Sequence, residues 1–392
     1  MPPKKNKKKR VLIATNELGE IRAGGVATYI ENLETMLKGE FEIGVLFIEN
    51  IWWYEKATDS KWFTKWLSEQ HKRYNGEFMA YSDGFLYKIK ELVKFINSYD
   101  VVIHSSWGCV KPLQFMKKYC SPKIKNIGIL HSNLIAESVF NDTRIDMDGQ
   151  QVKWLALMDK IVLISVSELV TYIEAGMDIA NDNVSIVYNP YIPRKKISKN
   201  KYLNEQNKQN MGYIGRFVPR KKPEHLVFAQ DKIRKIHGIN TRFIGAGVNM
   251  PNTYWDKLAK NYSNVVLHKW SSDKKAIERN FWQQVNLVGI TGVYEPFGYT
   301  CLEAIDRMIP ILVQDIGGPR EIVSGYEDAC FMYSTSTNEK LSVNNMQNSI
   351  IRYLNTPINE LHNKTKKMRE VIKRFDKDVI RDRWSNLIGD IL

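Results

Sequence analysis

The most regular feature of the chain is an alternation of short apolar runs with longer stretches of helical spacing. The runs are rich in β-branched residues and apolar at consecutive positions, which is typical of strands buried on both faces of a parallel sheet. Helical stretches such as Val26–Leu37 and Tyr87–Ile96 lie between them. This order predicts an α/β fold with helices on both faces of each sheet. The predicted strands are Val11–Thr15, Ile43–Ile48, Val101–His104, Asn126–His131, Ile161–Ser165 and Val184–Tyr188, followed by Met211–Gly215, Arg242–Gly245, Val265–His268, Leu287–Ile290, Ile311–Val313 and Cys330–Tyr333.

A polar and basic stretch over residues 193–210 interrupts this series and is interpreted as a linker. The length of 392 residues also exceeds what one hydrophobic core holds, about 250–300 residues. We therefore expect two Rossmann-like domains whose parallel sheets face an interdomain cleft, because ligands bind beyond the carboxyl ends of parallel strands. The expected segments are a basic disordered tail at 1–10, an N-terminal domain at 11–192, the linker, a C-terminal domain at 211–375, and a helix at 376–392 that packs back on the N-terminal domain.

Composition narrows the class of protein. A hydrophobic fraction of 43% and a charged fraction of 26% are those of a globular chain. The sequence contains no apolar run long enough to cross a membrane and no secretory signal, so we expect a cytoplasmic protein. Four cysteines without CxxC spacing favour neither a disulfide framework nor a structural zinc site.

The net charge of +14 is unevenly distributed. Residues 4–10 carry six of these charges, which leaves +8 on the rest of the chain. The tail is interpreted as solvated, although binding to nucleic acid or to an anionic membrane surface is the alternative. The remaining excess suits a protein that handles anionic ligands, and no recognised nucleic-acid motif accompanies it.

The segment 294–304, Tyr-Glu-Pro-Phe-Gly-Tyr-Thr-Cys-Leu-Glu-Ala, is the most informative motif. It follows a predicted strand and opens a helix, and Gly298 permits close backbone approach, so its free amide groups form an anion site suited to phosphate. Glu295 and Glu303 flank that site and can accept hydrogen bonds from sugar hydroxyls. Two surface glutamates at a helix start are the alternative interpretation.

This segment resembles the signature of retaining GT-B glycosyltransferases, in particular family 4 (glycosyl transferases group 1). The resemblance implies that Glu295 contacts the transferred sugar and that Glu303 binds the nucleotide ribose. It also implies that Phe297, Gly298, Tyr299 and Thr300 line the donor site, with backbone amides directed at the sugar or the diphosphate.

Two basic residues follow the first strand of the second half. Gly215-Arg216-Phe-Val-Pro-Arg-Lys221 resembles the family's Gly-Arg-Leu and Lys-Gly, which implies that Arg216 and Lys221 bind the diphosphate and stabilise the leaving group. A basic surface loop is the alternative, and we expect Arg220 and Lys222 to point to solvent. The family has glycine where Lys222 stands, which puts the geometry of this turn in question.

The first half supplies the remaining candidates. Gly24 and Gly25 resemble the family's glycine loop that closes over the donor, and an ordinary βα turn is the alternative. His131 stands at a strand end, in the place of the family's histidine that contacts the donor sugar, and we include it among the catalytic candidates with Glu295, Arg216 and Lys221. The segments 166–168 and 317–321 also match the family and are taken as fold markers.

The resemblance implies retaining transfer of a sugar from a UDP-, GDP- or ADP-linked donor to a glycan, glycolipid or other carbohydrate or lipid-linked hydroxyl acceptor. It also implies that the N-terminal domain at 11–192 binds the acceptor and the C-terminal domain at 211–375 binds the nucleotide sugar. No metal or other cofactor is expected, because no Asp-x-Asp motif occurs where a sugar-nucleotide site would need one. Asp146-Met-Asp148 has the spacing of such a motif but lies in a predicted loop. A sugar-nucleotide epimerase of the same fold and a basic nucleic-acid-binding protein are the alternatives; a nicotinamide dehydrogenase is disfavoured because no Gly-x-Gly-x-x-Gly opens either half.

The segment 51–67 has no counterpart in the family. It holds Trp52, Trp53, Trp62 and Trp66 interleaved with lysines. Sugar stacking or peripheral membrane contact would use exposed indoles, whereas packing on the N-terminal sheet would bury them. The packing interpretation is slightly favoured.

Overall fold

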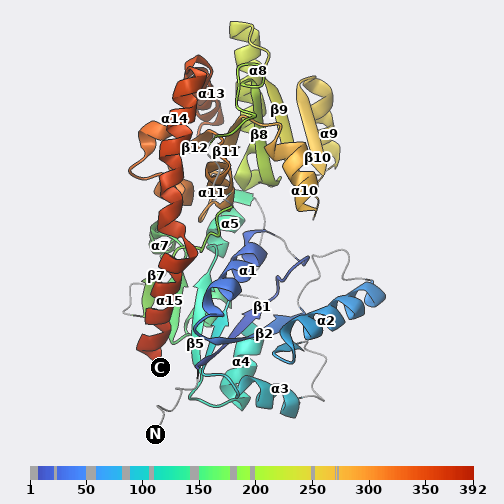
Figure 1. Ribbon diagram of the computed structural model, residues 1–392, viewed down its shortest axis with the longest axis vertical. Coiled ribbons are helices and arrows are strands. Elements are labelled where there is room, and N and C mark those ends of the chain that lie inside the picture. Colours follow the sequence, from blue (N-terminus) through green and yellow to red (C-terminus); the bar gives the residue numbers. More distant parts are fainter. Residues whose placement is uncertain are drawn as a thin grey trace.

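The computed structural model describes residues 8–21, 24–49, 59–81, 89–105, 110–141, 150–176, 183–194, 199–248, 252–269, 271 and 273–392. Two parallel sheets, each with helices on its faces, form an N-terminal and a C-terminal domain (Figure 1). The fold predicted from the apolar runs, two Rossmann-like α/β domains, is thereby confirmed. The segments 1–7, Trp52 and Trp53, and Asp146–Asp148 lie outside the described residues.

The N-terminal sheet has seven parallel strands in the order β3-β2-β1-β4-β5-β6-β7. The central strands are fully buried, as the continuous apolar runs require. The sequence pattern misses β3, a short strand at the sheet edge whose residues are mostly half-buried. The elements are β1 (Arg10–Thr15), α1 (Gly25–Leu37), β2 (Glu42–Ile48), α2 (Ser60–Tyr74), β3 (Phe78–Tyr81), α3 (Ile89–Ile96), β4 (Val101–His104), α4 (Val110–Tyr119), β5 (Lys125–Leu130), α5 (Leu134–Asn141), α6 (Gln150–Leu155), β6 (Lys160–Leu163), α7 (Val166–Glu174) and β7 (Val184–Ile186).

The C-terminal sheet has six parallel strands in the order β10-β9-β8-β11-β12-β13, so that β8 and β11 are neighbours at its centre. That adjacency brings the segments after these two strands to one edge of the sheet. The elements are β8 (Asn210–Arg216), α8 (Pro223–His237), β9 (Arg242–Val248), α9 (Asn252–Asn261), β10 (Val265–Lys269), α10 (Lys274–Ile277), β11 (Leu287–Ile290), α11 (Tyr299–Asp306), β12 (Ile311–Gln314), α12 (Gly317–Ile322), β13 (Phe331–Tyr333), α13 (Glu339–Asn355), α14 (Ile358–Met368) and α15 (Lys377–Ile391).

The last helix returns to the first domain. Asp376 caps α15 by accepting a hydrogen bond from the backbone N–H of Asp378, and the helix then runs alongside the N-terminal domain against α1 (Figure 1). Arg381 forms an ion pair with Glu40 at 3.0 Å. The fully buried Trp384 anchors the helix in the core. The two domains are therefore tied together by the chain terminus as well as by the segment between them.

The segment between the domains is less exposed than its polar sequence suggests. Leu203 packs in the core of the C-terminal domain. Lys208 is 6% exposed and donates to the backbone oxygen of Thr356 at 2.5 Å. The part from residue 199 onward is thus packed against the C-terminal domain.

The described tryptophans of the 51–67 segment pack inward. Trp66 is 4% exposed and lies against Phe47 of β2 with ring centroids 4.8 Å apart, and Trp62 is partly buried against the same core. The packing interpretation is confirmed for Trp66, because an indole buried on the sheet cannot stack on a ligand, and Trp62 packs on the same core with part of its surface exposed. No helix within the described ranges combines the length and the apolar content that crossing a membrane requires.

Candidate functional site

Candidate residues from both halves meet at the boundary between the two domains, where Gly24 lies beside Arg216 and Gly25 beside Tyr299. These contacts involve neither Glu303 nor His131, which packs against Tyr29 of its own domain. The Gly24–Gly25 loop and His131 come from the N-terminal domain, and Arg216, Lys221 and the 295–303 segment come from the C-terminal domain. Direct contacts join the two sides. A Cβ on Gly25 would lie 3.2 Å from Cδ2 of Tyr299, and one on Gly24 would lie 3.8 Å from Nε of Arg216. The glycines therefore allow the first helix of one domain to approach the candidate cation and aromatic ring of the other.

Arg216 is the last residue of β8, and its guanidinium reaches the interdomain boundary. It lies 3.7 Å from Glu137 of α5, and its side chain is 32% exposed. Burial, and then the neighbouring Arg220, lower the pKa of Arg216, whereas Glu137 raises it. Positive groups that repel each other in a half-buried place are stabilised by an anion.

Lys221 ends a 3₁₀ turn over Pro219–Lys221 and forms an ion pair with Glu295. The backbone oxygen of Lys221 accepts a hydrogen bond from Thr291 at 2.6 Å, which fixes the turn against the end of β11. Burial, and then the charges of Arg220 and Arg216, lower the pKa of Lys221. The structure thus pairs the two residues that the resemblance places on the diphosphate and on the sugar.

Arg220 does not point to solvent, so the expectation for this residue is wrong. Its side chain is 2% exposed, because it donates to the backbone oxygen of Tyr294 at 2.8 Å and pairs with Glu137 at 2.9 Å. Lys222 is likewise 23% exposed rather than free in solvent, and it pairs with Glu339 at 2.5 Å. The burial of Arg220 and the partial burial of Lys222 could not be predicted from their neighbours in the sequence, because the acidic partners Glu137 and Glu339 are far away along the chain.

Lys222 occupies a glycine-like backbone position. Its φ of +41° lies in the left-handed region, where non-glycine residues are strained. The resembled family has glycine at this place, so the turn keeps the glycine geometry while the chain carries a lysine.

The 295–303 segment forms a loop that opens α11. Gly298 is the N-cap residue of α11, with a φ of +105°, and the helix begins at Tyr299 directly after it, as predicted. The Tyr299 hydroxyl donates to Pro190 at 3.1 Å, and Thr300 donates to the backbone oxygen of Ile214 at 3.4 Å. These bonds hold the start of α11 against β8 and the interdomain segment.

Phe297 is placed differently from the rest of the set. It is 3% exposed, and its ring lies 5.5 Å from Phe375 and 5.4 Å from Tyr299 between ring centroids. This side chain belongs to an aromatic cluster that supports the loop. Glu303 lies on the second turn of α11 and is half-buried. Burial raises the pKa of Tyr299, and the charge of the Glu303 carboxylate raises it further, as a smaller cause.

His131 follows β5 directly and is half-buried against Tyr29, with ring centroids 4.8 Å apart in an edge-on arrangement. Burial lowers the pKa of His131 to about 3, so the imidazole is neutral at physiological pH. Its Nε2 is enclosed and has no hydrogen-bond partner among the described residues. A neutral imidazole with an unused nitrogen can bind a sugar hydroxyl but carries no charge to a phosphate.

A second group of interdomain contacts lies beside these residues. The Tyr294 hydroxyl donates to Glu168 of α7 at 3.0 Å and accepts from the backbone N–H of Asn133 at 2.7 Å. Burial raises the pKa of Glu168 to about 8, while the hydrogen bond from Tyr294 lowers it. The Ser165 hydroxyl donates to the backbone oxygen of Pro296 at 2.7 Å.

The two fold markers are the two sides of one contact. The Glu321 carboxylate accepts from the backbone N–H groups of Val166 and Ser167 at 3.0 and 3.1 Å, so that α12 of one domain caps α7 of the other. Helix capping normally uses a residue from the same chain segment, so the sequence pattern could not pair them.

Sequence reasoning missed Glu137, Arg220 and Tyr294 as members of this interface. Tyr294 and Arg220 stand inside the quoted motifs, and that position is the signal that could have identified them. Glu137 stands six residues after His131 with no pattern of its own, and only the fold brings it to the arginines.

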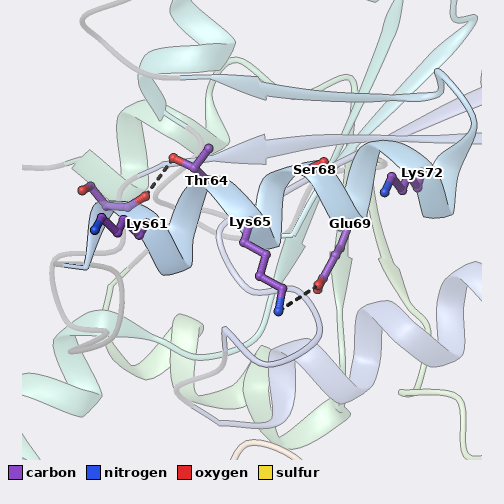
Figure 2. Close-up of a pocket in the computed structure, with 7 residues that line it drawn as sticks. Lys61, Thr64, Lys65, Ser68, Glu69 and Lys72 are labelled. Atoms are coloured by element: carbon purple, nitrogen blue, oxygen red, sulfur yellow. Dashed lines mark hydrogen bonds and ion pairs between the residues drawn. The ribbon is translucent and has the colours of Figure 1, made fainter.

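The pocket shown in Figure 2 lies elsewhere, along the outer face of α2. Its lysines include Lys65, which pairs with Glu69 at 4.0 Å. None of the residues singled out in the motifs lines it. The residues that line it are Ser60, Lys61, Thr64, Lys65, Ser68, Glu69 and Lys72.

Two facing Rossmann-like domains with this connectivity define the GT-B class of fold, which the solved structures support. The Anabaena protein Alr3699/HepE, solved in complex with UDP, is 15% identical, and the match covers 97% of this chain and 100% of that one with a TM-score of 0.69. The lipopolysaccharide outer core galactosyltransferase WaaB, solved in its apo form, is 18% identical over 98% of this chain and 100% of that one, with a TM-score of 0.66.

The sequence comparisons agree with this class. Residues 194–371 match the family Glycosyl transferases group 1. An uncharacterized glycosyltransferase of Methanocaldococcus jannaschii, MJ1607, is 24% identical over 254 residues, which are 61% of this chain and 63% of that relative's length. Together these findings show a GT-B fold, and residues 194–371 of its C-terminal half match the Glycosyl transferases group 1 family.

Proposed function

We propose that this protein is a retaining glycosyltransferase, of the family 4 kind, that uses a nucleotide-diphosphate sugar. The observation that carries the proposal is that Arg216, Lys221 and the N-terminus of α11 lie together at the interdomain boundary. Glu295, which forms an ion pair with Lys221, lies next to them. The solved Anabaena neighbour binds UDP, and further structures of it contain UDP with glucose and UDP-glucose. We extend a donor of this class, UDP-, GDP- or ADP-linked, to this chain.

The cations stabilise the departing diphosphate. Arg216 and Lys221 lie in places where burial and mutual repulsion oppose their charge, so an incoming diphosphate relieves both. The free amides at the start of α11 add fixed dipoles aimed at the same anion. Preorganised positive groups of this kind lower the energy of the leaving group without a metal ion, and a metal-independent reaction is part of the proposal.

Glu303 and Glu295 divide the donor between them. Glu303, on the second turn of α11, accepts hydrogen bonds from the ribose hydroxyls. Glu295, in the loop, contacts the transferred sugar together with His131, whose enclosed Nε2 is suited to a hydroxyl. The bond from the anomeric carbon to the phosphate oxygen breaks as the acceptor oxygen bonds on the same face, and the acceptor proton passes to the departing phosphate.

For the acceptor we propose a lipid-linked or glycolipid molecule rather than a free glycan. Apolar side chains are exposed on α5 and α7, beside the candidate site. The Phe140 ring stacks on Tyr294, the neighbour of Glu295, with centroids 5.9 Å apart. The face therefore begins at the proposed site of transfer. Its exposed members are Ile135, Val139, Phe140, Val166, Val170 and Ile173.

This acceptor would bring the protein to a membrane surface from the cytoplasm. Flotation with vesicles of mixed zwitterionic and anionic lipids tests the contact. Binding that Val139→Ser and Val170→Ser reduce supports it, and binding that neither substitution changes contradicts it. Ile236→Ser, at a 65% exposed position on α8 of the other domain, is the matched control.

The donor assignment is tested by nucleotide binding and turnover in Glu303→Ala and Glu295→Ala. We expect Glu303→Ala to weaken binding of the preferred nucleotide diphosphate about tenfold or more, since a hydrogen bond to a charged group contributes roughly 1.5–3 kcal/mol. We expect Glu295→Ala to bind that nucleotide normally and to lose transfer. Isothermal titration calorimetry with UDP, GDP and ADP measures the first effect, and release of nucleotide from the matching sugar donor measures the second.

Equal and unchanged affinity in both variants would contradict these roles. A sugar-nucleotide epimerase of the same fold would bind the donor but transfer nothing to any acceptor. A nucleic-acid-binding protein would bind oligonucleotides with strong salt dependence in a variant lacking residues 1–7, which keeps β1 intact, and would bind no nucleotide sugar.

A further inference from the structure

Glu137 is an acidic side chain of the N-terminal domain that forms ion pairs with cations of the opposite domain. It lies on α5, at the boundary between the domains (Figure 1). Its Oε1 is 2.9 Å from Arg220 and 3.7 Å from Arg216, and its side chain is 13% exposed. One carboxylate oxygen therefore bridges two guanidinium groups of the C-terminal domain.

The two arginines differ in what else holds them. Arg220 is almost fully buried and also donates to the backbone oxygen of Tyr294, so its position is fixed by the protein itself. Arg216 is more exposed, sits at a longer distance from the carboxylate, and borders Gly24 of the glycine loop. Arg216 is thus the guanidinium that an incoming anion can reach.

A carboxylate next to Arg216 opposes the binding of a diphosphate there. Two negative groups that share one guanidinium repel each other, and the repulsion is strong where the surroundings are partly buried. The diphosphate either binds against this repulsion or displaces the carboxylate. Displacement breaks the contact between α5 and Arg216, and α5 also carries the exposed Val139 and Phe140.

We propose that Glu137 is a specificity-determining residue that competes with the donor diphosphate for Arg216. This inference rests on the proposed function, because it takes Arg216 as a ligand of the diphosphate. Glu137 penalises ligands in proportion to the negative charge they place at Arg216. Release of Glu137 from Arg216 couples donor binding to the position of α5 on the acceptor side.

The test compares a charged and an uncharged ligand in Glu137→Gln, which keeps the size of the side chain and removes its charge. The dissociation constants of UDP and of uridine are measured by calorimetry, with the GDP–guanosine and ADP–adenosine pairs in parallel. We expect the preferred nucleotide diphosphate to bind at least tenfold more tightly to the variant and its nucleoside to bind equally to both proteins. Circular dichroism verifies that the variant is folded.

Glu321→Gln is the matched control. Glu321 also joins the two domains, through its bonds to Val166 and Ser167, but no contact places it near the cations. If loosening of the domains alone changed nucleotide affinity, this variant would show the same gain. A gain in Glu137→Gln that is absent in Glu321→Gln supports competition at Arg216.

Three results overturn the inference. These are an unchanged or weakened affinity for the nucleotide diphosphate in Glu137→Gln, the same factor for diphosphate and nucleoside, and the same gain in Glu321→Gln. Should Glu137→Gln fail to fold, Glu137→Asp withdraws the carboxylate by one methylene group and must raise the affinity in the same direction. Failure of the proposed nucleotide site looks different, since neither the natural protein nor any variant would then bind a nucleotide diphosphate. Failure of sugar transfer alone would leave nucleotide binding, and with it this test, intact.

Discussion

Replacing Glu168 with glutamine should change how the stability of this protein depends on pH. Glu168 is 0% exposed on α7 and accepts a hydrogen bond from Tyr294 across the domain boundary. Burial raises the pKa of its carboxyl group to about 8, the Tyr294 bond lowers it, and the nearby Glu137 raises it. Arg220 lowers it as the smallest of these influences. The folded protein therefore holds a proton on Glu168 at neutral pH.

The direction of the effect follows from proton binding. In the unfolded chain this carboxyl returns to its ordinary pKa of 4.5, so the folded protein binds one more proton between pH 4.5 and about 8. Its contribution to the free energy of unfolding is complete below pH 4.5 and is lost as the pH rises through 8. At about 1.36 kcal/mol per pKa unit, the free energy of unfolding loses at most about 5 kcal/mol. The loss is smaller if the two domains separate before they unfold, because water then reaches the carboxylate.

Urea unfolding at pH 5, 6.5, 8 and 9 measures this contribution in the natural protein and in Glu168→Gln. Glutamine cannot ionise, so the variant should gain stability over the natural protein as the pH rises, by about 2 kcal/mol or more at pH 9. Titration of His131 is common to both proteins and cancels in the difference. Glu174→Gln, an exposed position on the same helix, is the control. Parallel pH profiles for the natural protein and Glu168→Gln would refute the reasoning.

Two further substitutions test the geometry of the site. Gly25→Ala places a Cβ 3.2 Å from Tyr299 and should weaken nucleotide binding several-fold by calorimetry, whereas Gly24→Ala, whose Cβ would lie 3.8 Å from Arg216, should be tolerated; equal effects would contradict the close approach. Lys222→Gly should unfold at a higher temperature than Lys222→Ala, by about 1 kcal/mol in stability, because both lose the same ion pair but only glycine relieves the left-handed backbone. The reverse order in differential scanning calorimetry would count against that strain.

Much of the architecture was predictable because apolar continuity is a local property. The runs Val101–His104 and Leu287–Ile290 are strands with the predicted bounds, since a strand buried on both faces is apolar at nearly every position. The edge strand β3 escaped detection because an edge exposes part of its surface and the apolar signal weakens.

The candidate site divides in the same way. Residues at strand ends and helix starts, such as Arg216 and Gly298, could be singled out because turns and strand ends depend on a few neighbouring residues. Arg220 was assigned to solvent because its neighbours are polar, and only the folded structure reveals the partners that bury it. The role of Phe297 as support for the loop is likewise a matter of packing against Phe375, far away in sequence.

The sequence by itself determined the two parallel α/β domains, the positions of most strands, and the motifs that stand at their carboxyl ends. The tertiary structure decided which charges meet: Glu137 with Arg216 and Arg220, and Glu168 with Tyr294. The physical reason is range. Backbone preferences and burial patterns act between neighbours in the chain, whereas ion pairs, hydrogen bonds and the pKa changes they cause depend on distances that exist only after the two domains have come together.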